Sequence, residues 1–311
     1  MTTFQTSAGI ITNDAYLKIT RNICDVFGCN ESQLKEFTLL QEGLTNIVVS
    51  FRYNGGKYAY RHPGYGSDEL VDRGRESIVQ KTVEDAGIDT TLVAMSVKYG
   101  WRVSKFIENR PFDYSASTDM VRAIRLLKIL HQTPAKVRWE FDVLDKINDL
   151  KSKTPPEFET IYPEYKTLRA KVEDIYAKTK LNGIKKCLTH GDCRDVNFLI
   201  NDKEIYLIDW EYAGYGDPGF DVGSYICGGE HSENNIDSII RCYLGRKPTS
   251  LEYRHFISYI AITGFFYMHW TMYKEFSGQT VMELKTRWYN YVLSYVDKAL
   301  ALYEGTNEGE R

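Results

Sequence analysis

The sequence lacks a strong charge of either sign. Its 39 Lys and Arg residues are nearly balanced by 42 Asp and Glu residues, which gives a net charge of −3 over 311 residues. It also lacks polybasic runs, internal repeats and low-complexity segments. A balanced chain with 43% hydrophobic residues is typical of a folded protein with a sizeable core, and it offers no basic field to nucleic acid or an anionic membrane. We therefore expect neither nucleic acid nor a membrane as a partner.

The six cysteines include no C-x-x-C pair, and residues 1–5 lack the basic and apolar regions of a secretory signal. We therefore expect reduced thiols and a cytoplasmic protein. Cys187, His190 and Cys193 are close enough in the sequence to suggest a metal, but no fourth ligand follows at a suitable spacing. A zinc site is therefore not expected.

Long uncharged runs are scarce, but the one at residues 256–273 is long enough to raise the question of a membrane span. Ser258, Thr263 and His269 interrupt it, and Arg254 precedes it closely. We expect a buried helix, with a membrane-spanning helix as the alternative. The same region is rich in aromatic residues, since residues 253–303 hold 14 of the 42 in the sequence. Such an excess indicates core packing or the walls of a binding pocket.

Strand patterns are concentrated in the first third of the chain, and helical patterns dominate the rest. Two β-branched and aromatic runs, 47–53 and 57–61, flank the turn Asn54-Gly55-Gly56 and predict a hairpin. Further predicted elements are a helix at 69–87, a strand at 101–107, helices at 120–131, 163–180 and 251–303, and a short hairpin at 198–208.

These elements predict an α+β fold with two lobes. The smaller N-terminal lobe, residues 1–107, would contain a β-sheet and one main helix, and the larger C-terminal lobe, residues 108–311, would be mostly helical. A cleft between two lobes is a common place for a ligand.

The most informative stretch contains Asp192, Asn197 and Asp209. Asp192 and Asn197 are five residues apart, and Asp209 ends the 198–208 hairpin, so the turn brings Asn197 and Asp209 to one end of a site. Phosphoryl transfer uses such a set: one carboxylate orients the attacking hydroxyl and accepts its proton, while an amide oxygen and a second carboxylate hold Mg²⁺ on the ATP phosphates. We predict Asp192 as the catalytic base and Asn197 and Asp209 as Mg²⁺ ligands.

The motifs HGD at 190–192 and IDWEYAGYGDPGFD at 208–221 resemble those of the protein-kinase-like superfamily, and within it the aminoglycoside phosphotransferase and choline/ethanolamine kinase branch. The motifs resemble those of bacterial choline kinases in particular. The resemblance implies a two-lobed protein-kinase-like fold that binds ATP and Mg²⁺, with nucleotide binding in the N-terminal lobe and catalysis and substrate binding in the C-terminal lobe.

Three further residues of these motifs have expected roles. We expect Asp221 to brace the catalytic loop by accepting backbone N–H bonds, and His190 to be a packed, hydrogen-bonded loop residue. For Arg194, the alternatives are contact with the transferred phosphate and a side chain that is solvated or salt-bridged.

The resemblance also assigns nucleotide-binding roles. The segment 43–46 resembles a phosphate-binding loop, and Arg61 stands where protein kinases carry their strand lysine, which makes it the candidate catalytic clamp on the α- and β-phosphates. Glu76 is its candidate partner, and the strand at 104–107 fits the segment that contacts adenine. The implied ATP-binding residues are Leu44, Thr45, Asn46, Arg61, Glu76, Lys105, Phe106 and Ile107.

The acceptor pocket is expected in the C-terminal lobe. Tyr267 and Trp270 are three residues apart and share a helix face, and Trp288 lies on the next helical pattern, so the rings could surround a quaternary ammonium. This pattern resembles choline kinases, which carry two Trp three residues apart on the same helix. Tyr267 stands here in place of the first Trp. The predicted substrate-binding residues are Asp192, Glu211, Tyr267, Trp270, Trp288 and Glu230, with either Glu adding a carboxylate near the rings.

We therefore predict a choline kinase, which transfers the γ-phosphate of ATP to the hydroxyl of choline and gives phosphocholine. One alternative is a phosphotransferase for ethanolamine, another small alcohol or an aminoglycoside. An alternative of another class is a catalytically inactive kinase-like binding module, which the intact Asp192, Asn197 and Asp209 argue against. In each case the expected partner is a small molecule.

Overall fold

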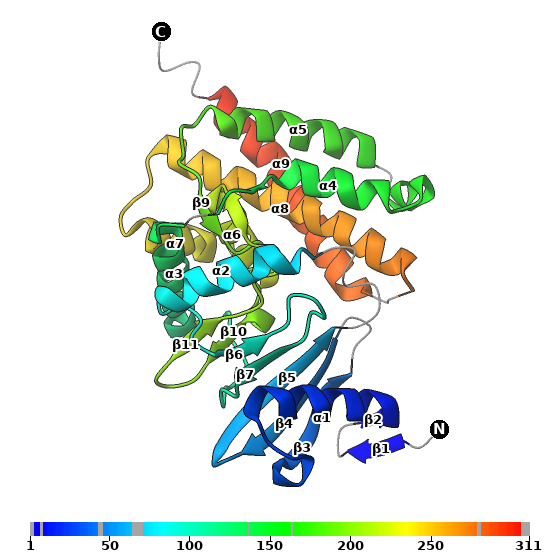
Figure 1. Cartoon of the computed structure of the whole chain (residues 1–311). Helices are drawn as coiled ribbons and strands as arrows, with labels where there is room; N and C mark the ends of the chain where they lie inside the picture. Colours follow the sequence, from blue (N-terminus) through cyan, green and yellow to red (C-terminus); the bar gives the residue numbers. More distant parts are fainter. Residues whose placement is uncertain are drawn as a thin grey trace. The chain divides into compact units, whose positions relative to one another are not determined.

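The computed structural model describes residues 3–6, 9–42, 46–63, 71–135, 137–162, 164–278 and 281–305. The chain divides into two compact units, Met1–Asn109 and Arg110–Arg311. Figure 1 shows that the first unit carries the larger sheet and that helices dominate the second. The predicted α+β arrangement of a sheet-containing unit followed by a mostly helical one is therefore present.

The N-terminal unit is built on a five-stranded antiparallel sheet in the order β3-β4-β5-β7-β6. The predicted hairpin is confirmed, since β4 and β5 pair along their whole length and are joined at Asn54 and Gly55. These two residues have φ values of 46° and 80°, and such positive values suit the tight turns that match strand twist. The strands are Lys35–Glu42 (β3), Asn46–Tyr53 (β4), Gly56–Pro63 (β5), Leu92–Met95 (β6) and Arg102–Lys105 (β7).

Helix α1, Asn13–Phe27, covers the core of this unit and was not predicted. It begins where the Thr12 hydroxyl accepts a hydrogen bond from the Ala15 N–H at 3.2 Å, and it ends at Gly28, whose φ is 62°. Its apolar face buries Ile19 and Ile23 in one cluster with side chains of β3, β4, β5 and β7. The other short elements here are Thr3–Thr6 (β1), Gly9–Thr12 (β2) and a 3₁₀ turn, Glu31–Gln33 (η1).

Helix α2, Arg73–Asp85, corresponds to the helix predicted at 69–87. The Asp72 side chain caps it by accepting a hydrogen bond from the Arg75 N–H at 3.1 Å. One face of α2 is buried, and this face includes the charged residues Arg73 and Glu76. The sheet strand β5 and helix α2 thereby bring Arg61 and Glu76 within reach of each other.

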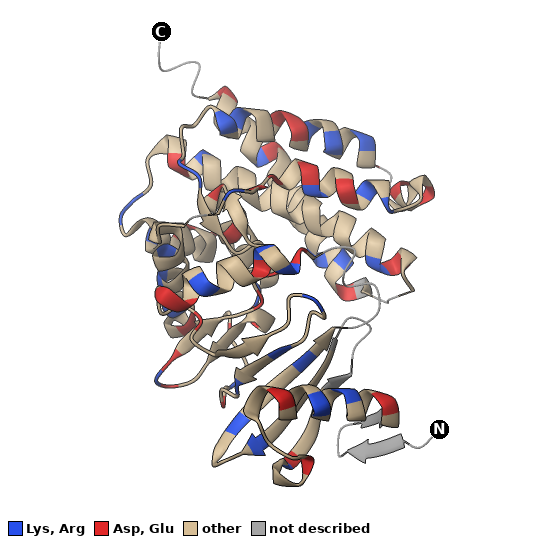
Figure 2. Cartoon of the chain, in the orientation of Figure 1, with Lys and Arg blue, Asp and Glu red and all other residues tan. Residues whose placement is uncertain are grey.

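Helix α8 lies at the centre of the C-terminal unit, because α4, α5, α6 and α9 all pack against it. Residues 255–269 are buried without exception, and Figure 2 shows the middle of α8 without charged residues. The prediction of a buried helix is thus confirmed. Among the described helices, none has the length and apolar character needed to cross a membrane. The helices are Ser117–Gln132 (α3), Val143–Ser152 (α4), Tyr165–Lys180 (α5), Pro218–Gly228 (α6), Glu233–Leu244 (α7), Ser250–Phe276 (α8) and Met282–Glu304 (α9).

Short strands fix the ends of the loop that carries the HGD motif. The loop leaves β9, passes through the 3₁₀ turn Asp195–Asn197 (η4) and enters β10, which pairs with β11 as the predicted hairpin. Asp209 follows β11 closely. The remaining elements are Glu140–Phe141 (β8), Pro156–Ile161 (η3), Cys187–Thr189 (β9), Phe198–Ile200 (β10), Ile205–Leu207 (β11) and Gly214–Gly216 (β12), with β12 between β8 and β9.

Candidate active site

A buried carboxylate holds the start of the loop between β9 and β10. Asp221, on α6, accepts hydrogen bonds from the backbone N–H groups of His190 at 2.7 Å and Gly191 at 2.9 Å. Gly191 has a φ of 86°, and a Cβ there would lie 2.9 Å from the Tyr212 carbonyl oxygen, so the loop requires glycine. The prediction that Asp221 braces this loop is confirmed.

The His190 ring ties the same loop to the strand that precedes Asp209. Its Nδ1 accepts a hydrogen bond from the Asp192 N–H at 3.1 Å, so the proton of the neutral ring is on Nε2, which lies 2.9 Å from the Ile208 carbonyl oxygen. The ring is fully buried and packs edge-on against Trp210 at 4.6 Å between centroids. His190 is therefore a packed, hydrogen-bonded loop residue, as predicted.

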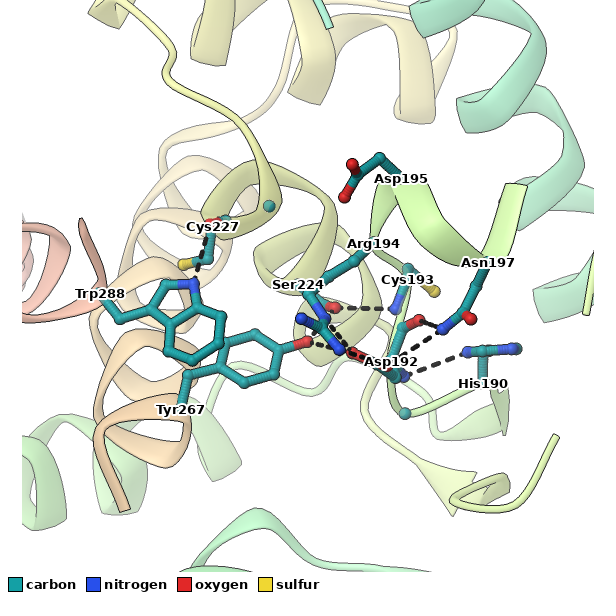
Figure 3. A network of polar contacts seen from close by, with 12 residues as sticks. His190, Asp192, Cys193, Arg194, Asp195, Asn197, Ser224, Cys227, Tyr267 and Trp288 are labelled. Atoms are coloured by element: carbon teal, nitrogen blue, oxygen red, sulfur yellow. Dashed lines mark hydrogen bonds and ion pairs between the residues drawn. The ribbon is translucent and has the colours of Figure 1, made fainter. Parts of the chain in front are cut away.

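Asp192 lies at the centre of a network of side-chain hydrogen bonds, drawn in Figure 3. Its Oδ1 accepts from Arg194 Nε at 2.6 Å and from the Tyr267 hydroxyl at 2.8 Å. Its Oδ2 accepts from an Arg194 terminal nitrogen and from Asn197 Nδ2, each at 3.0 Å. Each carboxylate oxygen thus accepts two side-chain hydrogen bonds, and the side chain of Asp192 is only 14% exposed.

Two opposing effects set the pKa of the Asp192 carboxyl. Burial by itself would raise this pKa, because a charged carboxylate is less stable away from water. The charge and hydrogen bonds of Arg194, with the hydroxyl of Tyr267, outweigh that effect and hold the pKa below its ordinary value. Asp192 is therefore a carboxylate at neutral pH, which is the form that can orient a hydroxyl and accept its proton.

A relay of hydroxyl groups connects α6 and α8 to Asp192. The Ser224 hydroxyl accepts from the Cys193 N–H at 2.8 Å and lies 2.6 Å from the Tyr267 hydroxyl. Since Tyr267 donates to Asp192, the hydroxyl of Ser224 is the donor to Tyr267. Burial, and then the charge of Asp192, raise the pKa of Tyr267, which keeps it a protonated donor. Sequence reasoning missed Ser224, although its position three residues after Asp221 puts both side chains on one helix face.

The three predicted pocket rings lie together, and Arg194 lies against all of them. The rings of Tyr267 and Trp288 stack at 4.5 Å between centroids, and those of Trp270 and Trp288 meet edge-on at 5.8 Å. The Arg194 guanidinium carbon is 5.5, 5.7 and 5.8 Å from the ring centroids of Tyr267, Trp270 and Trp288. Of the alternatives for Arg194, the structure has the salt-bridged side chain, with Asp192 as its partner.

Asn197 and Asp209 flank the β10–β11 hairpin, and the Ile208 N–H donates to the Asn197 carbonyl oxygen at 3.0 Å. The Asn197 amide nitrogen donates to the Asp192 backbone oxygen at 2.8 Å as well as to its carboxylate, so the amide oxygen is directed away from Asp192. Asp209 has a φ of 72°, an uncommon conformation for a residue other than glycine. Within the described residues no group of three or more His, Cys, Asp or Glu could hold a metal. An amide oxygen and one carboxylate fit Mg²⁺, which completes its coordination with water and substrate phosphates.

Three other charged residues of the C-terminal unit, Lys274, Glu211 and Glu230, differ in how close they lie to the aromatic rings. Lys274 is 8% exposed, its ammonium is 5.2 Å from the Trp270 ring centroid, and burial lowers its pKa while the charge of Glu211 opposes that shift. The Glu211 carboxylate is therefore close enough to Lys274, which lies beside the Trp270 ring, to affect the pKa of that lysine. Glu230 has an 84% exposed side chain, pairs with Arg287 at 3.6 Å, and lines a surface groove between α9 and the start of α7. Lys274 was not predicted, because its position depends on the burial of α8.

The candidate nucleotide residues of the N-terminal unit are only partly described. Glu76 is 3% exposed and contacts Arg73 at 2.9 Å, Arg61 at 3.5 Å and Arg102 at 3.5 Å. The pairing of Arg61 with Glu76 is confirmed, although Arg73 is closer. Arg73 and Arg102 were not predicted, and nothing in the local sequence distinguishes them from surface arginines. Leu44 and Thr45 lie outside the described residues, and Asn46 is described only as the first residue of β4.

The segment from Lys105 to Ile107 lies at the end of β7. The Phe106 N–H donates to the Lys57 carbonyl oxygen at 2.9 Å, and the Lys57 ammonium lies 3.8 Å from the Phe106 ring centroid. Lys105 ends the strand and reaches the Thr90 carbonyl oxygen at 3.5 Å. The Phe106 N–H is therefore bonded within the sheet.

Comparison with protein families gives one match over most of the chain. Residues 37–274 match the model of the family described as choline/ethanolamine kinase. The matched region contains Asp192, Asn197 and Asp209 and ends at Lys274, just past Trp270.

Individual relatives agree with this match. Protein LicA of Haemophilus influenzae is 23% identical over 84% of this chain and 78% of its own length, and a probable ethanolamine kinase of Arabidopsis thaliana is 25% identical over 78% of this chain and 67% of its own length. The crystal structure of choline kinase LicA from Streptococcus pneumoniae superposes with a TM-score of 0.78 at 19% identity, covering 92% of this chain and 100% of that one. The likeness of folds and the family match lead to one assignment: this chain belongs to the choline/ethanolamine kinase family, as an ATP-dependent phosphotransferase that acts on the alcohol group of a small molecule.

Proposed function

We propose that this kinase phosphorylates choline and releases phosphocholine. The observation that carries the proposal is the cluster of Tyr267, Trp270 and Trp288, whose rings lie within 6 Å of a guanidinium that is itself bonded to Asp192. Aromatic faces attract cations, and quaternary ammonium groups are bound in this way. A cation beside these rings would hold the hydroxyl of a short amino alcohol near the Asp192 carboxylate.

In this proposal Asp192 is the catalytic base. Its carboxylate accepts a hydrogen bond from the substrate hydroxyl, orients the oxygen toward the γ-phosphate and takes the proton as the new P–O bond forms. Asn197 keeps the carboxylate in place through its amide nitrogen, and Tyr267 does so through its hydroxyl. Asp221 supports the loop by binding two of its N–H groups.

Asn197 and Asp209 would hold Mg²⁺ through the amide oxygen and a carboxylate oxygen. The ion would bind the ATP phosphates and neutralise charge that develops during transfer. In the N-terminal lobe, proposed as residues 1–107, Arg61 would bind the α- and β-phosphates and Glu76 would orient it. Lys105, Phe106 and Ile107 would lie beside adenine, and Leu44, Thr45 and Asn46 beside the phosphates. Glu211 and Glu230 are the proposed acidic residues on the acceptor side, which belongs to residues 108–311.

The acceptor class is tested by a substrate screen with ATP and Mg²⁺. Choline, ethanolamine, their N-methylated intermediates and an aminoglycoside would be compared by ADP release, with Asp192→Asn as the inactive control. We expect the highest kcat/KM for choline and a loss of activity of at least about a hundredfold in Asp192→Asn, as is typical for removal of a general base.

Other outcomes of this screen assign other acceptors. A higher kcat/KM for ethanolamine than for choline would make the primary amine the preferred substrate. The presence of Tyr267 where choline kinases carry Trp favours this outcome. Activity toward the aminoglycoside alone would refute an amino-alcohol substrate. Equal ATP hydrolysis with and without every acceptor would refute the proposed transfer.

A further inference from the structure

Arg194 occupies the place that the proposed substrate needs. An amino alcohol has a cation that would lie beside the aromatic rings and a hydroxyl that would bind Asp192. The Arg194 guanidinium makes both kinds of contact at once, since it binds both Asp192 oxygens and lies within 6 Å of three ring centroids. We propose that Arg194 is a built-in competitor of the substrate, which must leave Asp192 and the rings before an amino alcohol binds. The inference rests on the proposed function and adds a residue that sets its substrate affinity.

The acceptor capacity of Asp192 is the first argument. Each of its oxygens already accepts two side-chain hydrogen bonds, and Arg194 donates one of the two at each oxygen. A carboxylate offers about four lone-pair sites, so a substrate hydroxyl finds a place only if one donor withdraws. Figure 3 shows the Arg194 guanidinium beside both the Asp192 carboxylate and the Tyr267 hydroxyl, where it takes one acceptor site on each carboxylate oxygen.

Arg194 is the donor most able to withdraw. Tyr267 is 3% exposed, stacks on Trp288 and is hydrogen-bonded to Ser224, and Asn197 is held by a second hydrogen bond to the Asp192 backbone. Arg194 comes from a loop rather than from a helix, has a long side chain and is 17% exposed. If Arg194 withdraws, only the contacts made by its own side chain are lost, and Tyr267 and Asn197 keep their positions.

The rings provide the second argument, because they leave little room for two cations. Tyr267 and Trp288 stack face to face with 23° between their planes, so no cation fits between these two. Lys274 already brings a second positive charge to the Trp270 ring, at 5.2 Å. A substrate ammonium that approached while Arg194 remained would meet two like charges in a partly buried site. Removing Arg194 therefore removes both a steric and an electrostatic obstacle.

The test compares Arg194→Ala with the wild-type protein by steady-state kinetics. We expect the KM for the amino alcohol to fall about tenfold, the change that one displaced charged contact corresponds to, while the KM for ATP is unchanged. An unchanged or higher KM for the amino alcohol would overturn the inference. Such a result would mean that Arg194 only supports the loop, or that it binds the substrate or phosphate.

Two further variants guard against trivial explanations. Arg194→Lys keeps the charge but loses the two-nitrogen contact with Asp192, so its KM should lie between those of the wild type and Arg194→Ala; a KM equal to or above that of the wild type in both variants refutes the inference. Arg246→Gln is the matched control, because Arg246 makes a similar two-nitrogen contact with Glu252 at 2.7 and 2.8 Å on an exposed part of the chain. This control should leave the KM of the amino alcohol unchanged.

A second measurement does not depend on turnover. Free guanidinium ion at millimolar, non-denaturing concentration should bind the space left in Arg194→Ala, change tryptophan fluorescence through Trp270 and Trp288, and leave the wild type unaffected. Where no amino alcohol is phosphorylated by either protein, the proposed function fails and the competitor role fails with it, while guanidinium binding to the variant alone still shows that Arg194 fills a cation site. If guanidinium affects the variant and the wild type alike, or neither of them, the inference is wrong.

Discussion

The hydroxyl of Tyr267 is the most informative single group to remove. It donates to Asp192 Oδ1 at 2.8 Å and accepts from Ser224 at 2.6 Å, while the ring is held by stacking on Trp288. Tyr267→Phe deletes the hydroxyl and retains the ring. The variant therefore separates the effect of this hydrogen bond on Asp192 from the role of the ring as a wall of the pocket.

The magnitude follows from the charge of the acceptor. A hydrogen bond to a charged group contributes about 1.5–3 kcal/mol, and about 1.4 kcal/mol corresponds to one pKa unit, so losing this bond should raise the pKa of Asp192 by roughly 1–2 units. Because the pKa of Asp192 is held below its ordinary value in the wild type, the carboxyl group protonates only at a pH below that ordinary value. In Tyr267→Phe the acid limb of kcat/KM should move upward by the same roughly 1–2 units.

The same bond has a pH-dependent effect on stability. Because the folded-state pKa of Asp192 is depressed, its stabilising contribution is present above the unfolded-state pKa of about 3.9 and is lost as the pH falls through the folded-state pKa. Tyr267→Phe should therefore lower the free energy of unfolding by about 1.5–3 kcal/mol at pH 7, and by less near pH 4.

Two assays decide the matter: kcat/KM from pH 4 to 8, and urea unfolding at pH 7 and pH 4. The matched control is Tyr291→Phe, since the Tyr291 hydroxyl donates to the Gly229 carbonyl oxygen at 2.8 Å and accepts from the His231 N–H. It should lose stability without moving the acid limb. Superimposable acid limbs for Tyr267→Phe and the wild type would refute the role assigned to this hydroxyl.

Three other variants test the supports of the site. Asp221→Asn should lower the free energy of unfolding by about 3 kcal/mol at pH 7, because an amide cannot accept from the His190 and Gly191 N–H groups as a carboxylate does. The pKa of Asp221 is held low despite burial, chiefly by His131, so the difference between variant and wild type should shrink below pH 4. A difference in urea unfolding that does not change with pH would contradict this. Gly191→Ala should cost about 3 kcal/mol in the same assay from strain and a clash with Tyr212, whereas the control Gly183→Ala, with a φ of 69° and no atom within 4 Å, should cost about 1 kcal/mol. Glu76→Gln should lower the free energy of unfolding by about 3 kcal/mol, because three buried or nearly buried arginines would then repel one another, and an equally stable variant would show that this carboxylate is not what holds them together.

Local sequence signals are sufficient where the structure depends on neighbouring residues. The hairpin of β4 and β5 follows from two β-branched runs around Asn54 and Gly55, and the HGD and IDW motifs indicate Asp192 and Asp209. Helix α1 was missed, although Thr12 and Gly28 are good capping residues on either side of a short amphipathic pattern. Because caps and amphipathic spacing are local, this helix could have been predicted from the sequence.

Other features depend on residues that are distant in the sequence. Arg194 and Tyr267 are 73 positions apart, so no spacing rule could tell that the guanidinium lies against the predicted rings. The gathering of Arg61, Arg73 and Arg102 around Glu76 likewise depends on how β5, α2 and β7 come together. Because the partners of Arg194 include residues so distant in the sequence, the sequence alone leaves salt bridge and phosphate contact as alternatives for its side chain. Side-chain partners across a fold are set by tertiary packing rather than by local propensity.

The left-handed backbone of Asp209 has a consequence for how such a chain can change over generations. Its φ of 72° suits glycine or asparagine better than aspartate, and holding aspartate there costs on the order of 1 kcal/mol. A copy of this chain released from selection for phosphoryl transfer would gain stability by drifting to glycine or asparagine at position 209. If Asp209 holds Mg²⁺ as proposed, aspartate at this position marks maintained activity, and among diverged copies its loss should precede decay of the neighbouring β10–β11 hairpin.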